Sequence, residues 1–195
     1  MGTDDARMRV MAAGREATVE DLSRVEQKAE LVNGRLVLMP PSGALPGFAG
    51  GEIFVSLRQY ARRTGSGHAL PEGVGFLVRL PNRRSFCPDV AFTTTLSLTR
   101  KFIDGAPLFA VEVRSDTDYG LAAERAMAAK RADYFAAGTL VVWDVDVLEA
   151  KTVRVYRAQN PFTATVYRRG QQAEAEPALP GWAMPVDDLF PAPGA

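Results

Sequence analysis

The chain has 195 residues, of which 47% are hydrophobic and 24% charged, and 23 basic against 23 acidic residues give a net charge of zero. This composition is typical of one globular domain, and it excludes a uniformly basic nucleic-acid-binding surface but not a local basic patch. The single Cys87 and the single His68 exclude a disulfide framework and a multi-Cys or His-rich metal centre. No apolar run approaches the roughly 18 residues of a membrane span. Residues 1–17 lack the apolar stretch of a secretory signal, so we expect a cytoplasmic location.

The N-terminal part opens with a segment that has no apolar periodicity. We expect residues 1–16 to be a flexible leader and residues 17–195 to form a single domain. Thr18 begins a capping-box pattern, Thr-Val-Glu-Asp, which predicts a short helix that ends before residue 30. Asn33-Gly34 then separates two apolar runs and predicts a hairpin, because both turn positions need positive φ.

The rest of the chain alternates between helical and strand patterns. Two long helices are expected, over residues 48–63 and 117–137. Apolar runs predict strands over the residues 74–80, 88–92, 108–113, 140–145, 152–157 and 163–168, the last two as a hairpin around Asn160-Pro161. The aromatic tail with Trp182 and Phe190 is expected to pack against the domain. This order predicts an α/β fold with a mixed central β-sheet flanked by helices.

Three carboxylates interrupt the apolar strands. Glu112 lies within Leu-Phe-Ala-Val-Glu-Val, Asp89 precedes Val-Ala-Phe, and Glu30 leads into Leu-Val. An unpaired buried carboxylate is unfavourable by several kcal/mol, so each one needs a cation, a proton or a metal. Period-2 alternation puts Ala110, Glu112 and Arg114 on one face of their strand. One interpretation is therefore structural, with Arg114 neutralising Glu112, and the other is a functional site.

Lys130 is the cation that matches these carboxylates. It lies in an alanine-rich part of the second long helix. We expect Ala126, Ala129 and Ala132 to let this helix pack close to the sheet. Alone, Lys130 would be an ordinary solvated lysine, but beside three carboxylates it is a candidate for activating water.

Several different short motifs lie along the chain, from Thr18 almost to the C-terminus. They are Glu30-Leu-Val-Asn-Gly-Arg-Leu-Val, Met39-Pro-Pro-Ser, Cys87-Pro-Asp-Val, Val111-Glu-Val-Arg-Ser, Lys130 with Tyr134, Trp143-Asp-Val-Asp, Leu179-Pro-Gly-Trp and Asp188-Leu-Phe. In this order and spacing they resemble the Uma2 family of restriction endonucleases, which belongs to the PD-(D/E)xK nuclease superfamily.

The resemblance implies a restriction-endonuclease-like fold and a metal-dependent DNA endonuclease that hydrolyses phosphodiester bonds. It implies that Asp89 and Glu112 are ligands of Mg²⁺ or Mn²⁺. The Val113 carbonyl would be a further ligand, because these ions prefer oxygen atoms. The resemblance further implies an acidic partner at Glu30 and a catalytic lysine at Lys130.

Two features depart from the family pattern. Arg114 stands where the usual ExK motif carries its lysine, and no His follows the Pro-Pro-Ser stretch. A guanidinium stays charged, whereas an ammonium beside a metal can exchange protons with water, so Lys130 is expected to be the catalytic cation. We expect Lys130→Ala to abolish cleavage and to leave folding nearly unchanged. Arg114, Arg83 and Arg84 are expected to be supporting or phosphate-facing residues.

Two other functions stay open on the sequence alone. A catalytically inactive, nuclease-derived nucleic-acid-binding or interaction module agrees with the zero net charge and the missing His. A glycosidase would use two carboxylates but leaves Lys130 unexplained. An enzyme that cuts both strands of a duplex is expected to be a homodimer, because two-fold symmetry matches that of the duplex.

Overall fold

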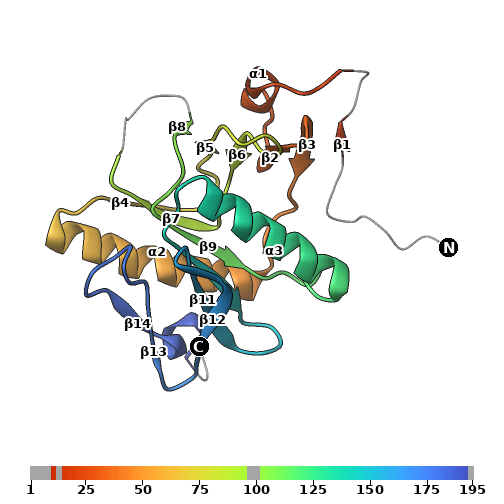
Figure 1. Cartoon of the computed structure of the whole chain (residues 1–195). Coiled ribbons are helices and arrows are strands. Elements are labelled where there is room, and N and C mark those ends of the chain that lie inside the picture. The colour runs from red at the N-terminus through yellow and green to blue at the C-terminus, as the bar shows by residue number, and fades with distance from the viewer. Residues whose placement is uncertain (1–9, 12–14, 96–101, 193–195) are drawn as a thin grey trace.

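The computed structural model describes residues 10–11, 15–95 and 102–192 (Figure 1). Its central sheet has six strands, in the spatial order β12 (Asn160–Arg168), β11 (Thr152–Arg157), β10 (Val141–Asp146), β9 (Phe109–Val113), β7 (Val90–Thr93) and β4 (His68–Leu70). The strands β9 and β10 are parallel, and every other neighbouring pair in this sheet is antiparallel. The predicted α/β fold with a mixed central sheet is confirmed.

Two long helices cover opposite faces of this sheet, α2 (Ala44–Thr64) and α3 (Leu121–Ala136) (Figure 1). Ile53 of α2 belongs to the same apolar cluster as Phe109 of β9. Tyr134 of α3 belongs to a second cluster with Ala110, the next residue of β9. The alternation of side chains along β9 therefore divides the core into two halves. The helix α3 is also the crossover that joins the parallel strands β9 and β10, which a hairpin turn cannot do.

Smaller sheets surround the central one. One has the order β1 (Val10–Met11), β3 (Arg35–Leu38) and β2 (Ala29–Val32), and another has the order β6 (Ser85–Phe86), β5 (Phe76–Leu77) and β8 (Ile103–Asp104). The remaining elements are α1 (Val19–Ser23), β13 (Gln172–Glu174), β14 (Ala183–Pro185) and the 3₁₀ helix η1 (Val186–Leu189). The Leu31 N–H donates to the Ser85 hydroxyl at 2.8 Å, and Leu31 O accepts from the Arg84 N–H at 2.9 Å. These bonds hold β2 beside β6 and bring Glu30 next to Cys87.

The local predictions for the N-terminal part are confirmed. Thr18 caps α1 and exchanges hydrogen bonds with Asp21. Asn33 and Gly34 form the hairpin turn between β2 and β3 with φ of 48° and 68°. The helix α2 begins earlier than predicted, at Ala44, because Pro46 in its first turn needs no N–H partner.

Several other boundaries differ from the prediction, three of them by more than two residues or in the place of a turn. The strand expected over residues 74–80 is reduced to β5. The hairpin of β11 and β12 turns at residues 158–159, because Arg157 pairs with Asn160. Pro161 therefore lies inside β12, which is an edge strand and tolerates the missing N–H. The helix α3 begins at Leu121, after Gly120 with a φ of 88°.

The predictions for the C-terminal tail and for the N-terminal leader fare differently. The tail packs as predicted, with Trp182 buried in the main core and Phe190 partly buried against it. Of the expected leader, residues 1–9 and 12–14 lie outside the described residues, and Val10–Met11 pair with β3. In the part of the chain that the structure covers, no helix is long and apolar enough to span a bilayer.

Candidate functional site

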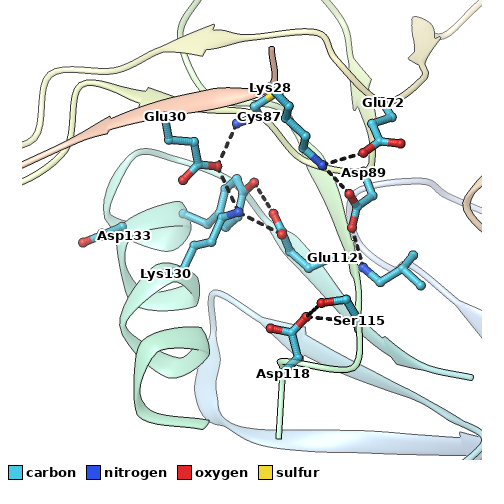
Figure 2. A network of polar contacts seen from close by, with 12 residues as sticks. Lys28, Glu30, Glu72, Cys87, Asp89, Glu112, Ser115, Asp118, Lys130 and Asp133 are labelled. Carbon is cyan, nitrogen blue, oxygen red and sulfur yellow. Dashed lines mark hydrogen bonds and ion pairs between the residues drawn. The ribbon is translucent and has the colours of Figure 1, made fainter. Parts of the chain in front are cut away.

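Asp89 and Glu112 come together where β7 and β9 run side by side. The Asp89 N–H donates to Val111 O at 3.0 Å, and the Val113 N–H donates to Oδ2 of Asp89 at 2.7 Å. The backbone of β9 thus fixes the Asp89 carboxylate beside the strand that carries Glu112. Both carboxylates point into one network of polar contacts (Figure 2).

Lys130 of α3 bridges two of the three carboxylates. Its Nζ lies 2.8 Å from Oε2 of Glu112 and 2.9 Å from Oε1 of Glu30. Tyr134, one helical turn later, donates its hydroxyl to Oε1 of Glu112 at 2.7 Å. The side chains of Lys130 and Tyr134 therefore hold both oxygens of Glu112, as neighbours at i and i+4 can.

Glu30 lies at the buried end of the network. It accepts the Cys87 N–H at 2.9 Å and pairs with the Arg83 guanidinium, whose Nε donates to Asp133 at 2.8 Å. Burial alone would raise the pKa of Glu30, but Lys130, Arg83 and the Cys87 N–H outweigh it and lower that pKa to about 2. Glu30 is therefore a carboxylate at neutral pH.

Glu112 shows the opposite behaviour. Burial raises its pKa, and the negative charges of Asp89 and Glu30 add to the effect, while Lys130 and Lys28 oppose it. The pKa of Lys130 is raised, because the attraction of Glu112 and Glu30 outweighs the lowering effect of burial. These two carboxylates therefore favour the charged, ammonium form of Lys130.

Lys28 is a member of the network that the sequence interpretation missed. Its ammonium pairs with Oδ1 of Asp89 and lies 3.0 Å from Oε1 of Glu72. Burial acts to lower the pKa of Lys28, but Asp89 and Glu112 raise it above the ordinary value. The sequence did contain a pattern that indicates Lys28. It stands two residues before Glu30, and strand periodicity puts residues two apart on the same face.

The structure brings together four of the expected residues, Glu30, Asp89, Glu112 and Lys130 (Figure 2). Val113 joins them through its N–H. Of the expected arginines, Arg83 is buried between Glu30 and Asp133, whereas the Arg84 side chain is exposed.

Arg114 lies apart from the network. Its Nε and Nη2 donate to the two oxygens of Asp144 at 2.7 and 2.8 Å, and its Nη1 pairs with Glu124. The structural interpretation that Arg114 neutralises Glu112 is wrong, because Lys130 takes that place. The Arg114 side chain is 1% exposed, so it supports the fold beside the site.

The alanines of α3 do not have the expected role. Ala126, Ala129 and Ala132 are exposed, so they do not pack against the sheet. The helix instead contacts the central sheet through Tyr134, which shares an apolar cluster with Ala110 and Val142. The Tyr134 ring also stacks on Phe86 of β6 with centroids 3.9 Å apart.

Two adjoining cavities open beside the network. One of about 170 Å³ is lined by Asp89 and Glu72 and by the glycines Gly47, Gly50 and Gly51 of α2. The other, of about 410 Å³, is lined by Lys28 and shares Glu72 and Gly47 with the first. We call the two together the Lys28 groove. It gives solvent and ligands access to Asp89.

The donor atoms of the network are hard carboxylate oxygens. Mg²⁺ and Mn²⁺ accept such ligands, and Mg²⁺ commonly binds through one or two carboxylates while keeping several waters. Among the described residues no group of three or more His, Cys, Asp or Glu side chains is arranged to hold a metal. Two carboxylates of the network, those of Asp89 and Glu112, are donors of the kind that such an ion accepts.

Comparisons with known proteins agree with this geometry. The model of the Uma2 family, described as "Putative restriction endonuclease", matches residues 18–187. Four chains of known structure match, among them a crystal structure of "a putative nuclease belonging to DUF820" from Anabaena variabilis. That structure is 16% identical in sequence, has a TM-score of 0.71, and the match covers 89% of this chain and 97% of that chain. No curated protein matches the chain. The family match spans the sheet, both long helices and every residue of the polar network, and the chain belongs to the Uma2 family.

Proposed function

We propose that this protein is a metal-dependent endonuclease of the PD-(D/E)xK type that hydrolyses phosphodiester bonds in DNA, with Mg²⁺ or Mn²⁺ as its cofactor. The observation that carries the proposal is the meeting of Asp89, Glu112 and Lys130 in one network. Asp89 and Glu112, together with the Val113 carbonyl, are the proposed metal ligands. Family membership and the nuclease-like fold agree with this activity.

The formal charges of the network fit a divalent cation. Five of its carboxylates form ion pairs with its cations, namely the carboxylates of Glu30, Glu72, Asp89, Glu112 and Asp133. It contains three cations, those of Lys28, Arg83 and Lys130. The excess of two negative charges equals the charge that one Mg²⁺ or Mn²⁺ neutralises. Burial is the main cause of the raised pKa of Glu112, and the negative charges of Asp89 and Glu30 add to it.

The residues of the chain have separate roles in the proposed reaction. A bound divalent cation supplies polarisation of the phosphate and a water of lowered pKa. Lys130, as an ammonium, donates to a phosphate oxygen on which negative charge increases. Glu30 holds Lys130 from the far side, and Tyr134 and the Val113 N–H fix the orientations of Glu112 and Asp89.

The surface around the site supports a nucleic-acid substrate. Arg84 is exposed on the segment that carries Arg83, and we propose it as a contact for backbone phosphates. We propose a homodimer that uses β12, a nine-residue edge strand on which the Phe162 side chain is 92% exposed. The cytoplasmic location stays a prediction from the sequence.

A cleavage assay tests the proposal. Plasmid, single-stranded and branched DNA are incubated with the wild-type chain and Mn²⁺ or Mg²⁺, and products are resolved on gels. Cleavage is expected to need the metal and to fall at least 100-fold in Glu112→Gln. The control Glu26→Gln changes an exposed residue outside the network and should cleave normally.

One observation favours a second candidate, an inactive module that binds nucleic acid. Asp89 already has the Lys28 ammonium as a partner, so the network is partly neutralised without a metal. Calorimetry separates the two functions. Binding of Mn²⁺ that is lost in Glu112→Ala supports the endonuclease, and binding of DNA with no Mn²⁺ binding supports the module.

A further inference from the structure

The Lys28 ammonium pairs with one carboxylate oxygen of Asp89, a proposed metal ligand. The Lys28 side chain is 14% exposed, and the oxygen that its ammonium contacts is Oδ1. The other oxygen, Oδ2, accepts the Val113 N–H at 2.7 Å. Lys28 therefore covers the oxygen of Asp89 that the Val113 N–H does not contact.

The second partner of Lys28 gives its ammonium another position. Glu72 lies 3.0 Å from the Lys28 Nζ on the side away from Glu112, and it accepts the Ser42 hydroxyl at 3.1 Å (Figure 2). The lysine stem has four rotatable bonds, so the ammonium can leave Asp89 and keep Glu72. A divalent cation on Asp89 would repel the ammonium and favour this change.

The Lys28 groove begins at Asp89 and Glu72, the two partners of Lys28. The smaller cavity reaches Asp89, the larger one is lined by Lys28, and both are lined by Glu72 and Ser42. An ammonium released from Asp89 thus faces a groove that leads to Asp89 itself.

One wall of the groove is a bare stretch of helix. Gly47, Gly50 and Gly51 line it from α2, although glycine inside a helix is less stable than alanine. A Cβ placed on Gly51 would meet no atom within 4 Å, so packing inside the protein does not require glycine there. The missing side chains leave the wall open to close approach by a ligand.

We propose that Lys28 is a phosphate-binding residue of the enzyme. It leaves Asp89 when a divalent cation binds there, and its ammonium then contacts a backbone phosphate of the nucleic-acid strand in the Lys28 groove. The inference rests on the proposed function, because it needs a metal at Asp89. An ammonium is a compact charge that binds phosphate without a fixed geometry, which suits a contact that forms only after the metal.

The first part of the test measures metal binding without turnover. Titration calorimetry with Mn²⁺ alone should give an affinity about tenfold higher for Lys28→Met than for wild type, because the competing ammonium is gone. Lys28→Arg keeps the charge and should bind Mn²⁺ like wild type. Lys151→Met, a change to an exposed lysine far along the chain, is the matched control.

The second part measures the phosphate contact. Duplex binding is followed against salt concentration with a fixed concentration of Ca²⁺, while gels verify that the DNA stays intact. One lost phosphate contact makes the slope of log K against log salt smaller by about 0.9. Lys28→Met should show this change with Ca²⁺ and no change without it. Gly51→Ala should fold normally and bind the duplex about tenfold more weakly with Ca²⁺, because its methyl group obstructs close approach of the strand to the groove wall.

Each failure has a separate meaning. A wild-type chain that binds no Mn²⁺ contradicts the proposed metal-dependent function and this inference with it. Wild-type metal binding with an unchanged affinity in Lys28→Met contradicts the inference alone. A salt slope that Lys28→Met leaves unchanged with Ca²⁺, or normal duplex binding by Gly51→Ala, also contradicts the inference and leaves the endonuclease proposal standing.

Discussion

Tyr134 donates its hydroxyl to the Glu112 oxygen that Lys130 does not contact, at 2.7 Å. The carboxylate of a proposed metal ligand is thus held in one orientation by a neutral donor and a charged one from the same helix. Groups that orient a metal ligand in this way affect metal affinity although they do not touch the metal.

Tyr134→Phe tests this relationship. The phenyl ring keeps the stacking on Phe86 and removes only the hydroxyl. A lost hydrogen bond to a carboxylate lowers the free energy of unfolding by roughly 1.5–3 kcal/mol. Mn²⁺ affinity should fall roughly 10- to 100-fold. Urea unfolding and calorimetry measure the two effects, and unchanged metal affinity in a less stable variant would assign Tyr134 to packing alone.

Lys130→Met should destabilise the protein as well as inactivate it. The ammonium lies between Glu112 and Glu30, so its removal leaves two carboxylates with one cation fewer. Loss of one member of such a buried ion pair destabilises proteins by about 3–5 kcal/mol. The sequence-based expectation of nearly unchanged folding for Lys130→Ala therefore does not fit this geometry. Urea unfolding of Lys130→Met is compared with that of the control Lys151→Met. Equal urea midpoints for the two variants would support the expectation that folding is nearly unchanged.

Glu30 makes stability depend on pH in the acid range. Its pKa is about 2 in the folded chain against an ordinary value of 4.5, so the unfolded chain binds the proton more readily. Its contribution is complete above pH 4.5 and is lost as the pH falls toward 2, and it amounts to roughly 3 kcal/mol. Glu30→Gln should flatten the rise of unfolding free energy across this range, whereas the exposed control Glu26→Gln should keep it. If the free energy of unfolding changes with pH in the same way in Glu30→Gln and in wild type, groups other than Glu30 cause the pH dependence.

Arg114→Met should affect stability and leave the metal site intact. The variant leaves Asp144 without its two-pronged partner in a buried position, which destabilises by about 3–5 kcal/mol. Arg114→Lys should recover only part of this, because an ammonium cannot match both oxygens. Thermal unfolding measures the loss, with the exposed Arg125→Met as control. Mn²⁺ affinity lowered tenfold or more in Arg114→Lys would instead make Arg114 part of the functional site.

The parts of the fold that the sequence predicted are those governed by neighbouring residues. Thr18 reaches Asp21 three residues away, and the Asn33-Gly34 turn needs only its own backbone angles. The three carboxylates were also recognisable, because a charge inside an apolar strand conflicts with its surroundings. Lys130 was singled out as the cation that matches these carboxylates, and the family pattern pointed to the same residue.

The missed contacts join segments that are distant in the chain. Lys28 pairs with Asp89 across 61 positions, and the Cys87 N–H reaches Glu30 across 57. No local pattern specifies such a pairing, because it depends on how β2 and β6 are placed beside the central sheet. For the same reason, strand alternation correctly put Arg114 on the Glu112 face but did not identify Asp144 as its partner.

The attachment of α3 has a consequence for motion. Tyr134 is the fully buried residue of this helix, whereas α2 buries Pro46, Ala49, Ile53, Leu57 and Tyr60. The helix α3 is therefore held largely by ion pairs and hydrogen bonds, and its amide hydrogens should exchange with solvent before those of α2. Each local opening of α3 carries Lys130 away from Glu112 and Glu30 while the sheet stays folded. The contacts of Lys130 with Glu112 and Glu30 thus form and break together, at a lower free energy than global unfolding.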